Sequence, residues 1–529
     1  MSVLTDGHSP ATNSYVPTIS EASTAPQPLW AKVIDQTRCI GCHACTTACK
    51  SENEVPLSVT RTYVKSVDVG RHPRARRAFQ VTRCNQCEDA PCVAACPTAA
   101  MYSREDGIVD FDKSACIGCK ACIAACPYDA IFINPDDHSA EKCNFCAHRL
   151  DIGLEPACVV VCPTEALIVG DMNDPLSEVA GIVHQEPVAV RRPEKETRPK
   201  VFYKGADRAT LDPLAARQPE GGLFMWSEQD NGHGKVSSGH TGPRNSSAAA
   251  LLSYDVPHEI PWDFRVSLYT FTKSIAAGAY LVPLLLAVAG MIPWSSPVWT
   301  LVGPLVALAF LVLTGTLLVW DLEHPERFWM VLARPQWRSW LVRGGFAITA
   351  YGALLAAHIA AVVAGRPEWT LTLAWAGGPL AVATAVYTAY LLAQARARDL
   401  WQSPLLPPHF LVQALLAGSG ALMLADLATG GALALGVGAA WIFQASLAVH
   451  VALALGEATM THPTAHAALA ARGMLRGRYA GPYWTGFFFA AAALALVAMG
   501  VHIGVAAGLA ALLLYEHAYL QAGQSVPLS

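Results

Sequence analysis

Cysteine is the residue type with the clearest chemistry in this sequence, and its spacing is regular. All 16 cysteines lie between residues 39 and 162, in four groups that begin at Cys39, Cys84, Cys116 and Cys143. Each group contains C-x2-C units, and in the last three groups the final cysteine is followed by proline. Three closely spaced thiolates can bind one face of an iron–sulfur cube, while the fourth reaches a neighbouring cluster. Sixteen ligands at four each therefore predict four 4Fe–4S clusters.

Two other uses of cysteine have to be weighed. Paired C-x2-C units also build zinc sites, and cysteines also form disulfides. A zinc site gains nothing from a third and a fourth cysteine so close, and the run that ends in Cys-Pro is typical of iron–sulfur proteins. Disulfides are disfavoured because no export signal is recognisable at the N-terminus. The spacing therefore favours iron–sulfur clusters, with zinc as the main alternative.

The sequence around the cysteines is repeated. Cys96, Cys126 and Cys162 each open a similar Cys-Pro segment that leads into a short, apolar, strand-like piece. This repeat predicts an α+β domain of two stacked ferredoxin-like units over residues 30–170.

The segments on either side of this domain are polar. Residues 1–29, rich in Ser, Thr and Pro, are expected to form a disordered leader. Residues 171–262 are rich in Pro, Gly and Ser and are expected to be an extended linker, with one strand-like island at residues 201–203.

The C-terminal half is much more apolar. The chain of 529 residues is 53% hydrophobic and only 15% charged, which is too apolar for a soluble enzyme of this size. Residues 263–529 are therefore expected to form an all-α membrane domain of eight transmembrane helices. The eight apolar stretches cover residues 268–290, 298–320, 345–364, 371–392, 409–428, 432–456, 483–500 and 503–520.

The loops between these stretches predict the orientation and a duplication. Loops on the N-terminal side carry Arg327, Arg334, Arg338, Arg343, Arg396, Arg398, Arg472, Arg476 and Arg478, whereas the opposite loops carry only Arg366. By the positive-inside rule the cysteine-rich domain faces the cytoplasm of a multi-pass protein in the cell membrane. A His-Pro pair follows both the second stretch, at His324, and the sixth, at His462, which favours two four-helix bundles.

The motifs resemble two known families. The cysteine groups, including Cys84-Asn-Gln-Cys-Glu-Asp-Ala-Pro-Cys and Lys142-Cys-Asn-Phe-Cys, resemble the four-cluster electron-transfer subunits of the dimethyl-sulfoxide-reductase superfamily. Asp321-Leu-Glu-His-Pro-Glu-Arg-Phe-Trp and Arg334-Pro-Gln-Trp-Arg-Ser-Trp resemble the NrfD-type polysulfide-reductase membrane anchor. These are usually separate subunits, so the chain resembles their fusion. The resemblance implies a partner subunit with a molybdenum or tungsten pterin cofactor, where substrate catalysis takes place.

The resemblance also implies how the cysteines are shared between clusters. The first group would share two clusters with the fourth group, and the two middle groups would share the other two. The implied ligands are Cys39, Cys42, Cys45 and Cys162 (set 1); Cys49, Cys143, Cys146 and Cys158 (set 2); Cys84, Cys87, Cys92 and Cys126 (set 3); and Cys96, Cys116, Cys119 and Cys122 (set 4).

A quinone-reactive anchor needs polar groups in the membrane part, because quinol couples two electrons to two protons. Ionisable residues inside a bilayer are costly and are therefore the default candidates. Those on the cytoplasmic half are Lys273, Asp321, His324, Arg327, His450, Glu457, Glu516 and His517. The predicted quinone site combines the Asp321 and His324 pair with Arg327 and Lys273.

Some of these candidates have an alternative interpretation. Asp321 and Glu323 would instead only pair with Arg327 and the following arginines at the membrane interface. His450 and Glu457 would form part of a proton path or a hydrogen bond that packs helices. A haem is not expected, because it would need facing histidine pairs.

These expectations combine into one function. The sequence predicts a membrane-bound, quinone-reactive electron-transfer subunit of a molybdopterin oxidoreductase complex that acts on sulfur compounds such as sulfite, polysulfide or thiosulfate. The alternatives are a formate-dehydrogenase-linked subunit, a redox-driven ion-translocating module and an anchor that binds no quinone. The net charge of −4, without a basic surface interleaved with aromatic residues, argues against a nucleic-acid partner.

Overall fold

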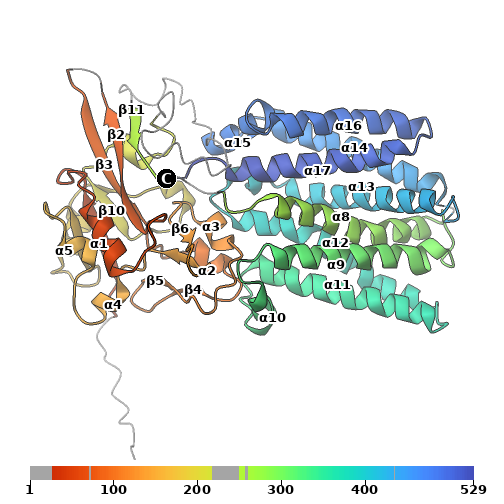
Figure 1. Cartoon of the computed structure of the whole chain (residues 1–529), viewed down its shortest axis with the longest axis horizontal. Coiled ribbons are helices and arrows are strands. Elements are labelled where there is room, and N and C mark those ends of the chain that lie inside the picture. Colours follow the sequence, from red (N-terminus) through yellow and green to blue (C-terminus); the bar gives the residue numbers. More distant parts are fainter. Residues whose placement is uncertain (1–26, 71–72, 217–249, 257–259, 434, 529) are drawn as a thin grey trace, which may run out of the picture.

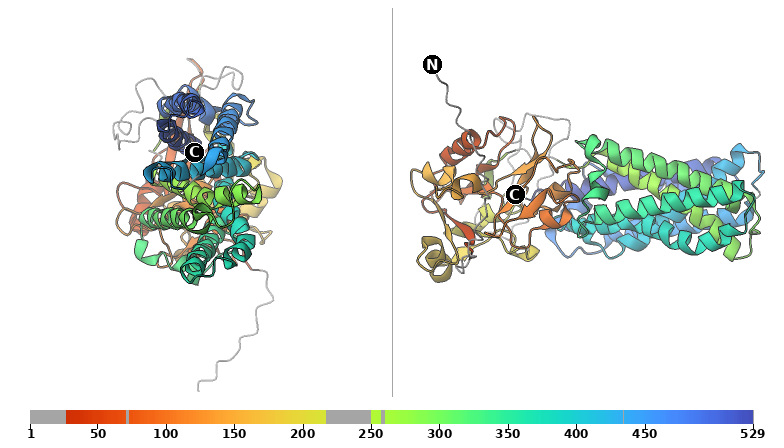
Figure 2. Two further views of the ribbon diagram at one scale, coloured as in Figure 1. Left: turned by 90° about the vertical axis from the view of Figure 1, so that its right-hand side faces the viewer. Right: turned by 90° about the horizontal axis from the view of Figure 1, so that it is seen from below.

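The computed structural model describes residues 27–70, 73–216, 250–256, 260–433 and 435–528. An α/β part and a bundle of long helices follow one another along the long axis of the molecule (Figure 1). The view from below shows the same end-to-end arrangement (Figure 2, right). Most of the leader expected over residues 1–29 lies outside the described residues.

A four-stranded sheet lies at the centre of the α/β part. Its strand order is β8-β1-β10-β9. β1 (Trp30–Asp35) pairs antiparallel with β8 (Leu167–Asp171) and parallel with β10 (Val201–Lys204), and β10 pairs antiparallel with β9 (Val188–Ala189). β1 is buried along almost its whole length because its side chains pack into hydrophobic clusters on both faces of the sheet. The sheet therefore joins the two ends of the cysteine-rich segment.

A second sheet is built on a long hairpin. β2 (Thr62–Val69) and β3 (Arg76–Arg83) pair antiparallel over eight residues, and β11 (Ala250–Tyr254) adds to β2. The segment expected as a linker, residues 171–262, thus supplies strands to both sheets. We therefore propose a domain boundary near residue 260 rather than at residue 170.

Short elements carry the cysteines between these sheets. Four three-residue strands are paired as two small hairpins, β4 with β5 and β6 with β7. The remaining elements of this part are α1 (Ala44–Glu52), α2 (Pro91–Ala95), β4 (Met101–Ser103), β5 (Val109–Phe111), α3 (Ala121–Ala125), β6 (Ile131–Ile133), β7 (Ala140–Lys142), α4 (Ala147–Leu150), α5 (Ala157–Val160), α6 (Glu178–Gln185) and α7 (Arg208–Leu211). This mixture confirms the α+β, ferredoxin-like prediction.

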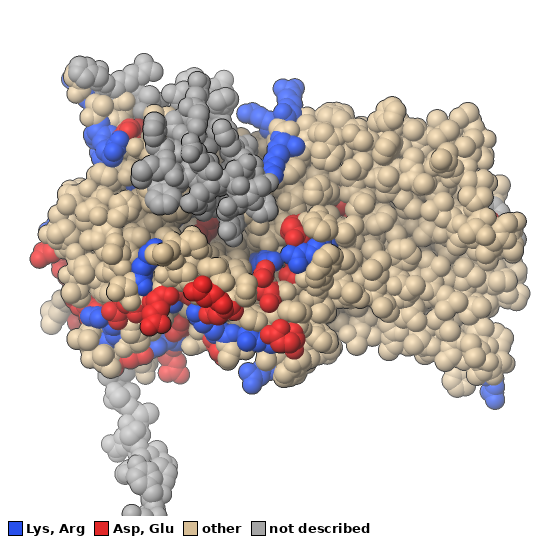
Figure 3. Space-filling view, viewed as in Figure 1, with Lys and Arg blue, Asp and Glu red and all other residues tan. Residues whose placement is uncertain are grey.

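The described residues contain eight helices that are long and apolar enough to cross a membrane, so the predicted number is confirmed. They are α8 (Phe264–Val288), α9 (Gly303–Trp320) with the preceding π-helical turn Val298–Val302, α11 (Trp340–Val363), α12 (Trp369–Gln394), α13 (Leu406–Ala428), α14 (Gly436–Thr459), α16 (Ala480–Ala498) and α17 (Ile503–Gln524). The short helices α10 (Met330–Ala333) and α15 (Ala465–Leu475) lie in the loops toward the α/β part. The face of the helical part seen in Figure 3 is almost free of charged side chains.

Helix α8 is the central helix of the membrane part. It packs against α9, α12, α13 and α17, and it is the most buried of the eight. Gly278 on α8 and Gly418 on α13 bring the two backbones into direct contact, because a Cβ atom at either position would overlap the other helix. This crossing joins α8, α9, α11 and α12 to the later helices. The division into two four-helix bundles stays a prediction.

The two parts share one hydrophobic core. Alanines 95, 121, 124 and 125 of α2 and α3 belong to the same buried cluster as Trp262, Tyr269 and Trp401 of the helical part. The last described residues return to the α/β part, where the buried Leu528 donates its backbone N–H to Asp129 at 3.3 Å. The α/β part is therefore packed firmly onto one end of the helices.

Candidate metal centres and the membrane junction

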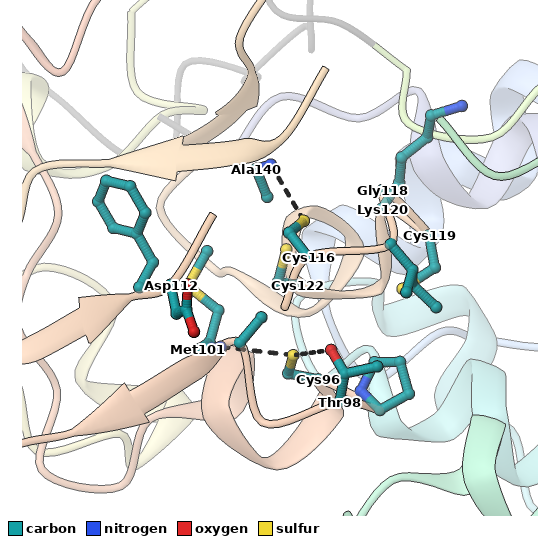
Figure 4. A pocket seen from close by; sticks show the side chains of 14 residues that line it. Cys96, Thr98, Met101, Asp112, Cys116, Gly118, Cys119, Lys120, Cys122 and Ala140 are labelled. Atoms are coloured by element: carbon teal, nitrogen blue, oxygen red, sulfur yellow. Dashed lines mark hydrogen bonds between the residues drawn. The ribbon is translucent and has the colours of Figure 1, made fainter. Parts of the chain in front are cut away.

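The cysteines lie around separate cavities in the α/β part. The cysteines of set 4 line one cavity (Figure 4), those of set 2 line a second, and those of set 1 line a third. The set 3 cysteines are all buried in one apolar core, where Cys84 and Cys87 influence Cys126 electrostatically. The structure thus brings the cysteines of sets 1, 2 and 4 together in the groups that the family resemblance implied, and the grouping of set 3 stays a prediction.

Positive backbone φ angles direct these cysteines into their cavities. In the set 4 loop, Gly118 has a φ of 68° and Lys120, which precedes α3, has a φ of 61°. Gly41 takes the same conformation in the set 1 loop, with a φ of 71°. The left-handed turns let Cys116 and Cys119 on the loop face the same cavity as Cys122 on the helix. The repeated Cys-Ile-Gly-Cys sequence therefore has a conformational reason.

Hydrogen-bond donors point at the sulfur atoms. The backbone N–H of Met101 donates to Cys96 Sγ at 3.4 Å, and that of Ala140 donates to Cys116 Sγ at 3.3 Å (Figure 4). Such donors stabilise sulfur in its anionic, metal-binding form.

In set 2, two buried cationic side chains also favour the anionic form of a cysteine sulfur. Lys32 and Arg83 are buried, and both donate to Cys158 Sγ, at 3.6 and 3.2 Å. Burial alone would raise the pKa of the Cys158 thiol, but the two cations outweigh it and lower that pKa to about 7. In contrast, burial raises the pKa of the Cys45 thiol to about 11. Buried cations need an anion beside them, and a cluster with four thiolate ligands is an anion.

The cavities suit a polynuclear group better than a single ion. Across the described ranges, no three His, Cys, Asp or Glu side chains converge closely enough to hold one metal ion. The sulfurs of sets 1, 2 and 4 instead stand apart around a cavity. Four separated thiolates are what an iron–sulfur cube requires, whereas zinc binds thiolates at about 2.3 Å from one point. The residues present therefore fit iron–sulfur clusters.

Set 4 lies directly against the membrane helices. The indole Nε1 of Trp262, one residue before the N-cap of α8, donates to the carbonyl of Cys119 at 3.2 Å. Lys120 pairs with Glu323, which follows α9, at 2.8 Å. Gly118 has no room for a Cβ atom because the Glu323 side chain occupies that position. The set 4 cavity is thus the one at the junction of the two parts.

His324 and Arg327 also contact the α/β part. His324 Nε2 donates to the carbonyl of Asp137 at 2.9 Å, and Arg327 donates to the carbonyls of Lys113 and Cys116, each at 3.0 Å. These contacts use the polar atoms of both side chains at the junction surface. We therefore propose a docking role for His324 and Arg327, which replaces the role of quinone ligands expected from the sequence.

Asp321 is buried at the same junction. Its carboxylate lies 3.7 Å from Arg265 at the start of α8, and its Oδ1 atom has no hydrogen-bond partner. Burial raises the pKa of Asp321 to about 6, although Lys120 and Arg265 act in the opposite direction. The alternative in which Asp321 and Glu323 pair with Arg327 is wrong in its partners, because these carboxylates pair with Arg265 and Lys120 instead.

Lys273 lies deeper in the bilayer region. Its ammonium group is fully buried between α8, α12 and α13, and it donates to the Ala385 carbonyl at 2.7 Å and to Thr388 Oγ1 at 2.8 Å. The ring centroid of Phe410 lies 4.5 Å from Nζ. Because eight residues separate Lys273 from Arg265, Lys273 lies about 12 Å further along the helix axis than the Arg265 and Asp321 pair. The four predicted quinone residues therefore do not form one compact site.

Residues 30–51 match the family described as "4Fe-4S binding domain", residues 76–172 match "4Fe-4S dicluster domain", and residues 254–515 match "Polysulphide reductase, NrfD".

Many curated relatives match the N-terminal part of the chain, and three of them are described here. The B subunit of tetrathionate reductase from Salmonella typhimurium is 44% identical over 209 residues, which cover 39% of this chain and 82% of the relative. The B subunit of polysulfide reductase from Wolinella succinogenes is 45% identical over 34% of this chain and 95% of the relative. Thiosulfate reductase electron transfer subunit PhsB of Salmonella typhi is 49% identical over 29% of this chain and 81% of the relative.

The protein belongs to this family of iron–sulfur B subunits. It differs from a separate B subunit in that an NrfD domain with eight candidate membrane helices follows in the same chain. The B-subunit–NrfD fusion is thus a multi-pass membrane protein with an iron–sulfur electron-transfer domain. The fusion places the set 4 cysteines and the first NrfD helix in one covalent unit.

The NrfD domain of this fusion also contains a polar cluster that the sequence indicated only in part. His450 on α14 lies 2.9 Å, Nδ1 to Nε2, from His409 on α13. Glu457 accepts a hydrogen bond from Tyr515 of α17 at 2.9 Å and lies 3.7 Å from His409. His450 and Glu457 therefore bind other helices rather than each other. Sequence reasoning missed His409 because it follows two prolines near a helix start, where a histidine reads as a surface residue.

The last two candidates face α8 from helix α17. Glu516 accepts a hydrogen bond from Thr270 at 3.0 Å, and its Oε1 atom is buried without a partner. His517 Nδ1 lies 3.3 Å from Ser267 Oγ. These contacts extend the polar face of α8 that begins at Lys273.

Proposed function

We propose that this chain transfers electrons between a molybdopterin catalytic subunit and the quinone pool through four 4Fe–4S clusters. The observation that carries the proposal is the hydrogen bond from Trp262, just before helix α8, to Cys119 of set 4, because a cluster held by set 4 would lie next to the membrane helices. The relatives are named for tetrathionate, polysulfide and thiosulfate reductases, so we infer a sulfur compound as the terminal substrate. Substrate catalysis then lies on the partner subunit.

The quinone head group is proposed to bind along α8. Trp262 contacts Cys119 just before α8 begins, the buried Tyr269 and Lys273 follow on α8, and Asp321 and Glu516 flank this helix. A quinone carbonyl needs a hydrogen-bond donor, and Lys273 Nζ supplies one next to Thr388. Quinol oxidation releases two protons. Asp321 lies nearer the α/β part than Lys273 and does not touch the head group in this proposal, but its pKa of about 6 suits it to take up one proton on the way out.

The catalytic partner is proposed to dock at the opposite end of the cluster series. Set 1 is the most exposed of the four sets, because Cys42 is exposed and Cys39 and Cys162 are half-buried. Ile40 beside it and Val160 on α5 are 57% and 58% exposed. Exposed apolar residues around a metal centre fit a surface that a partner covers.

The orientation is proposed from charge. The arginines of the loops toward the α/β part outnumber the single Arg366 of the opposite loops, so the α/β part faces the cytoplasm. Arg327 also docks the α/β part.

The test is quinol-driven reduction of the clusters in membranes that contain the full chain. Replacement of Lys273 by Met removes the donor while it keeps the apolar length of the side chain. We expect the rate to fall at least about tenfold, because one hydrogen bond from a charged donor is worth about 1.5–3 kcal/mol. Thr316→Val on α9 is the matched control, because Thr316 is exposed and binds the carbonyl of Val312 in its own helix. An unchanged rate in Lys273→Met contradicts the proposed quinone site.

One observation favours a second candidate function, a redox-driven ion-translocating module. His409, His450, Glu457 and Tyr515 form a buried polar cluster, in which Glu457 Oε1 and His409 Nδ1 have no hydrogen-bond partner. Buried ionisable groups of this kind occur in proton relays. Proton release on the far side of sealed vesicles during quinol oxidation, abolished by Glu457→Gln, would support this candidate over simple electron transfer.

A further inference from the structure

Set 2 differs from the other cysteine sets in the donors that its sulfur atoms receive. Lys32 and Arg83 donate to Cys158 Sγ, and the amide of Asn53 lies within hydrogen-bond distance of Cys49 Sγ at 3.7 Å and of Cys146 Sγ at 3.8 Å. In the part of the chain that the structure describes, no other lysine or arginine donates to a cysteine sulfur.

The charges of Lys32 and Arg83 are not compensated by carboxylates. Both side chains are at most 1% exposed, and within the described ranges neither has an ion pair with Asp or Glu. Nε and Nη2 of Arg83 have no hydrogen-bond partner at all. Arg61, at the same cavity, is different, because Glu141 neutralises it at 2.6 Å. Arg61 holds the Asn53 amide oxygen at 2.8 Å and so aims the amide nitrogen at the sulfurs.

The described cations near the other sets do not donate to sulfur, and this includes the buried Lys200, which acts electrostatically on Cys84 and Cys87 of set 3. At set 4, Lys120 is paired with Glu323, and the buried carboxylate of Asp321 lies nearby. At set 3, Lys142 donates to the backbone carbonyls of Val109 and Cys143 rather than to sulfur.

Set 1 receives a backbone donor. The N–H of Ala166 lies 3.2 Å from Cys162 Sγ, and this is a neutral donor. Among the described residues, cationic side chains therefore donate directly to sulfur at set 2 alone.

Positive charge close to a cluster raises its reduction potential and so determines which cluster of the series is reduced first. Reduction of a 4Fe–4S cluster adds one negative charge, and nearby positive charge and hydrogen bonds to sulfur stabilise the reduced form. We propose that Lys32 and Arg83 make the set 2 cluster the highest-potential one of the four, so that a single electron in the chain rests there. One electron arrives from a neighbouring cluster, and no bond or proton is exchanged. This inference rests on the proposed four-cluster function.

Because of its position in the series, a reduced cluster at set 2 would have a role in electron transfer. Cys158 of set 2 packs in the same core as Cys45 of the exposed set 1, and Cys143 of set 2 packs in the same core as the set 3 and set 4 cysteines. Set 2 therefore lies between set 1 and the sets nearer the membrane. The reactions at both ends exchange two electrons, whereas the clusters pass one at a time. An electron held at set 2 leaves the set 4 cluster oxidised and ready for the second electron of quinol.

The test is a redox titration followed by EPR spectroscopy, on membranes that contain the full chain. In Lys32→Gln we expect the highest of the four midpoint potentials to move to more negative values. A tenfold lower equilibrium constant for reduction, which is about 59 mV for a one-electron couple, is the smallest shift expected. Lys32→Arg keeps the charge and should keep the potential. Lys65→Gln is the matched control, because Lys65 is similarly buried in the same domain but lies 3.9 Å from the Asp255 carboxylate.

Three outcomes overturn the inference. They are four unchanged midpoints in Lys32→Gln, a shift in a lower component while the highest stays in place, and an equal shift in Lys65→Gln. If Lys32→Gln does not assemble its clusters, Asn53→Ala replaces it, and a highest midpoint that is unchanged in Asn53→Ala also counts against the inference. Fewer than four cluster signals in the unsubstituted protein would instead contradict the proposed four-cluster function, so the two failures are distinguishable.

Discussion

Trp262 donates its indole N–H to the backbone carbonyl of Cys119 at 3.2 Å, and this single bond links the membrane-side cysteine set to the start of helix α8. The Trp262 ring is buried and stacks on Trp401, with ring centroids 5.7 Å apart. Cys119 packs against the same hydrophobic core. The position of the set 4 loop is therefore fixed by the membrane helices and not by the α/β part alone.

Replacement of Trp262 by Phe should slow electron transfer between quinol and the clusters without loss of iron. The ring volume is mostly retained, but the hydrogen bond to Cys119 is lost, which costs about 1 kcal/mol at the junction. Stopped-flow measurement of cluster reduction checks this. Trp484→Phe is a suitable control, because Trp484 is a half-exposed tryptophan whose indole binds the Leu475 carbonyl. Equal rates in both variants would contradict a role for the Trp262 contact.

Replacement of Arg327 by Ala should loosen the junction. Arg327 binds the carbonyls of Lys113 and Cys116, and loss of hydrogen bonds to a charged group costs about 1.5–3 kcal/mol. Amide hydrogen exchange over residues 113–119 should become faster. Arg338→Ala provides the comparison, since Arg338 is an exposed arginine of the same loop. Exchange that is as slow in Arg327→Ala as in Arg338→Ala would show that Arg327 does not hold the two parts together.

The rate of quinol oxidation should fall as the pH drops through about 6. Burial raises the pKa of Asp321 to about 6, so this carboxyl is ionised and able to accept a proton above that pH and is protonated below it. Asp321→Asn cannot accept a proton at any pH, so its rate should be low and should lose this dependence. A rate–pH profile that spans both sides of this pKa tests the sign. A profile of the same shape in both proteins would remove Asp321 from the proton route.

Local patterns were enough to predict much of the fold. The cysteine repeats indicated an α+β ferredoxin-like domain, and the apolar stretches indicated eight membrane helices, because both signals depend only on short-range spacing. The helices begin or end a few residues away from the predicted limits. For example, α8 begins at Phe264, since the cap formed by Asp263 starts the helix before the apolar stretch does.

Long-range contacts were not predictable in the same way. β10 and β11 come from the segment read as a linker, and their strand character depends on pairing with β1 and β2, which are far away in sequence. His324 and Arg327 read as membrane-site residues because they follow a transmembrane helix, yet their partners are backbone carbonyls of the α/β part. Every residue has a backbone carbonyl, so the sequence does not show which carbonyls accept these hydrogen bonds.

The sequence did not predict the pairing of His409 with His450 for a related reason. The two residues are 41 positions apart on different helices, and only the packing of α13 against α14 brings their rings together. Likewise, Thr388 carries no charge and gave no sign that it binds Lys273. Membrane sites built from one ionisable and one neutral residue are therefore only half visible in a sequence.

The central claim is that electrons pass between a quinone on helix α8 and the cluster held by set 4. EPR spectroscopy of anaerobic membranes after addition of a quinol analogue, compared with dithionite as a full reductant, tests it most directly. We predict that dithionite produces reduced 4Fe–4S signals in the unsubstituted protein and in Lys273→Met, whereas quinol produces them quickly only in the unsubstituted protein. Reduction by quinol at the same rate in both proteins, or no iron–sulfur signal with dithionite, would contradict the account.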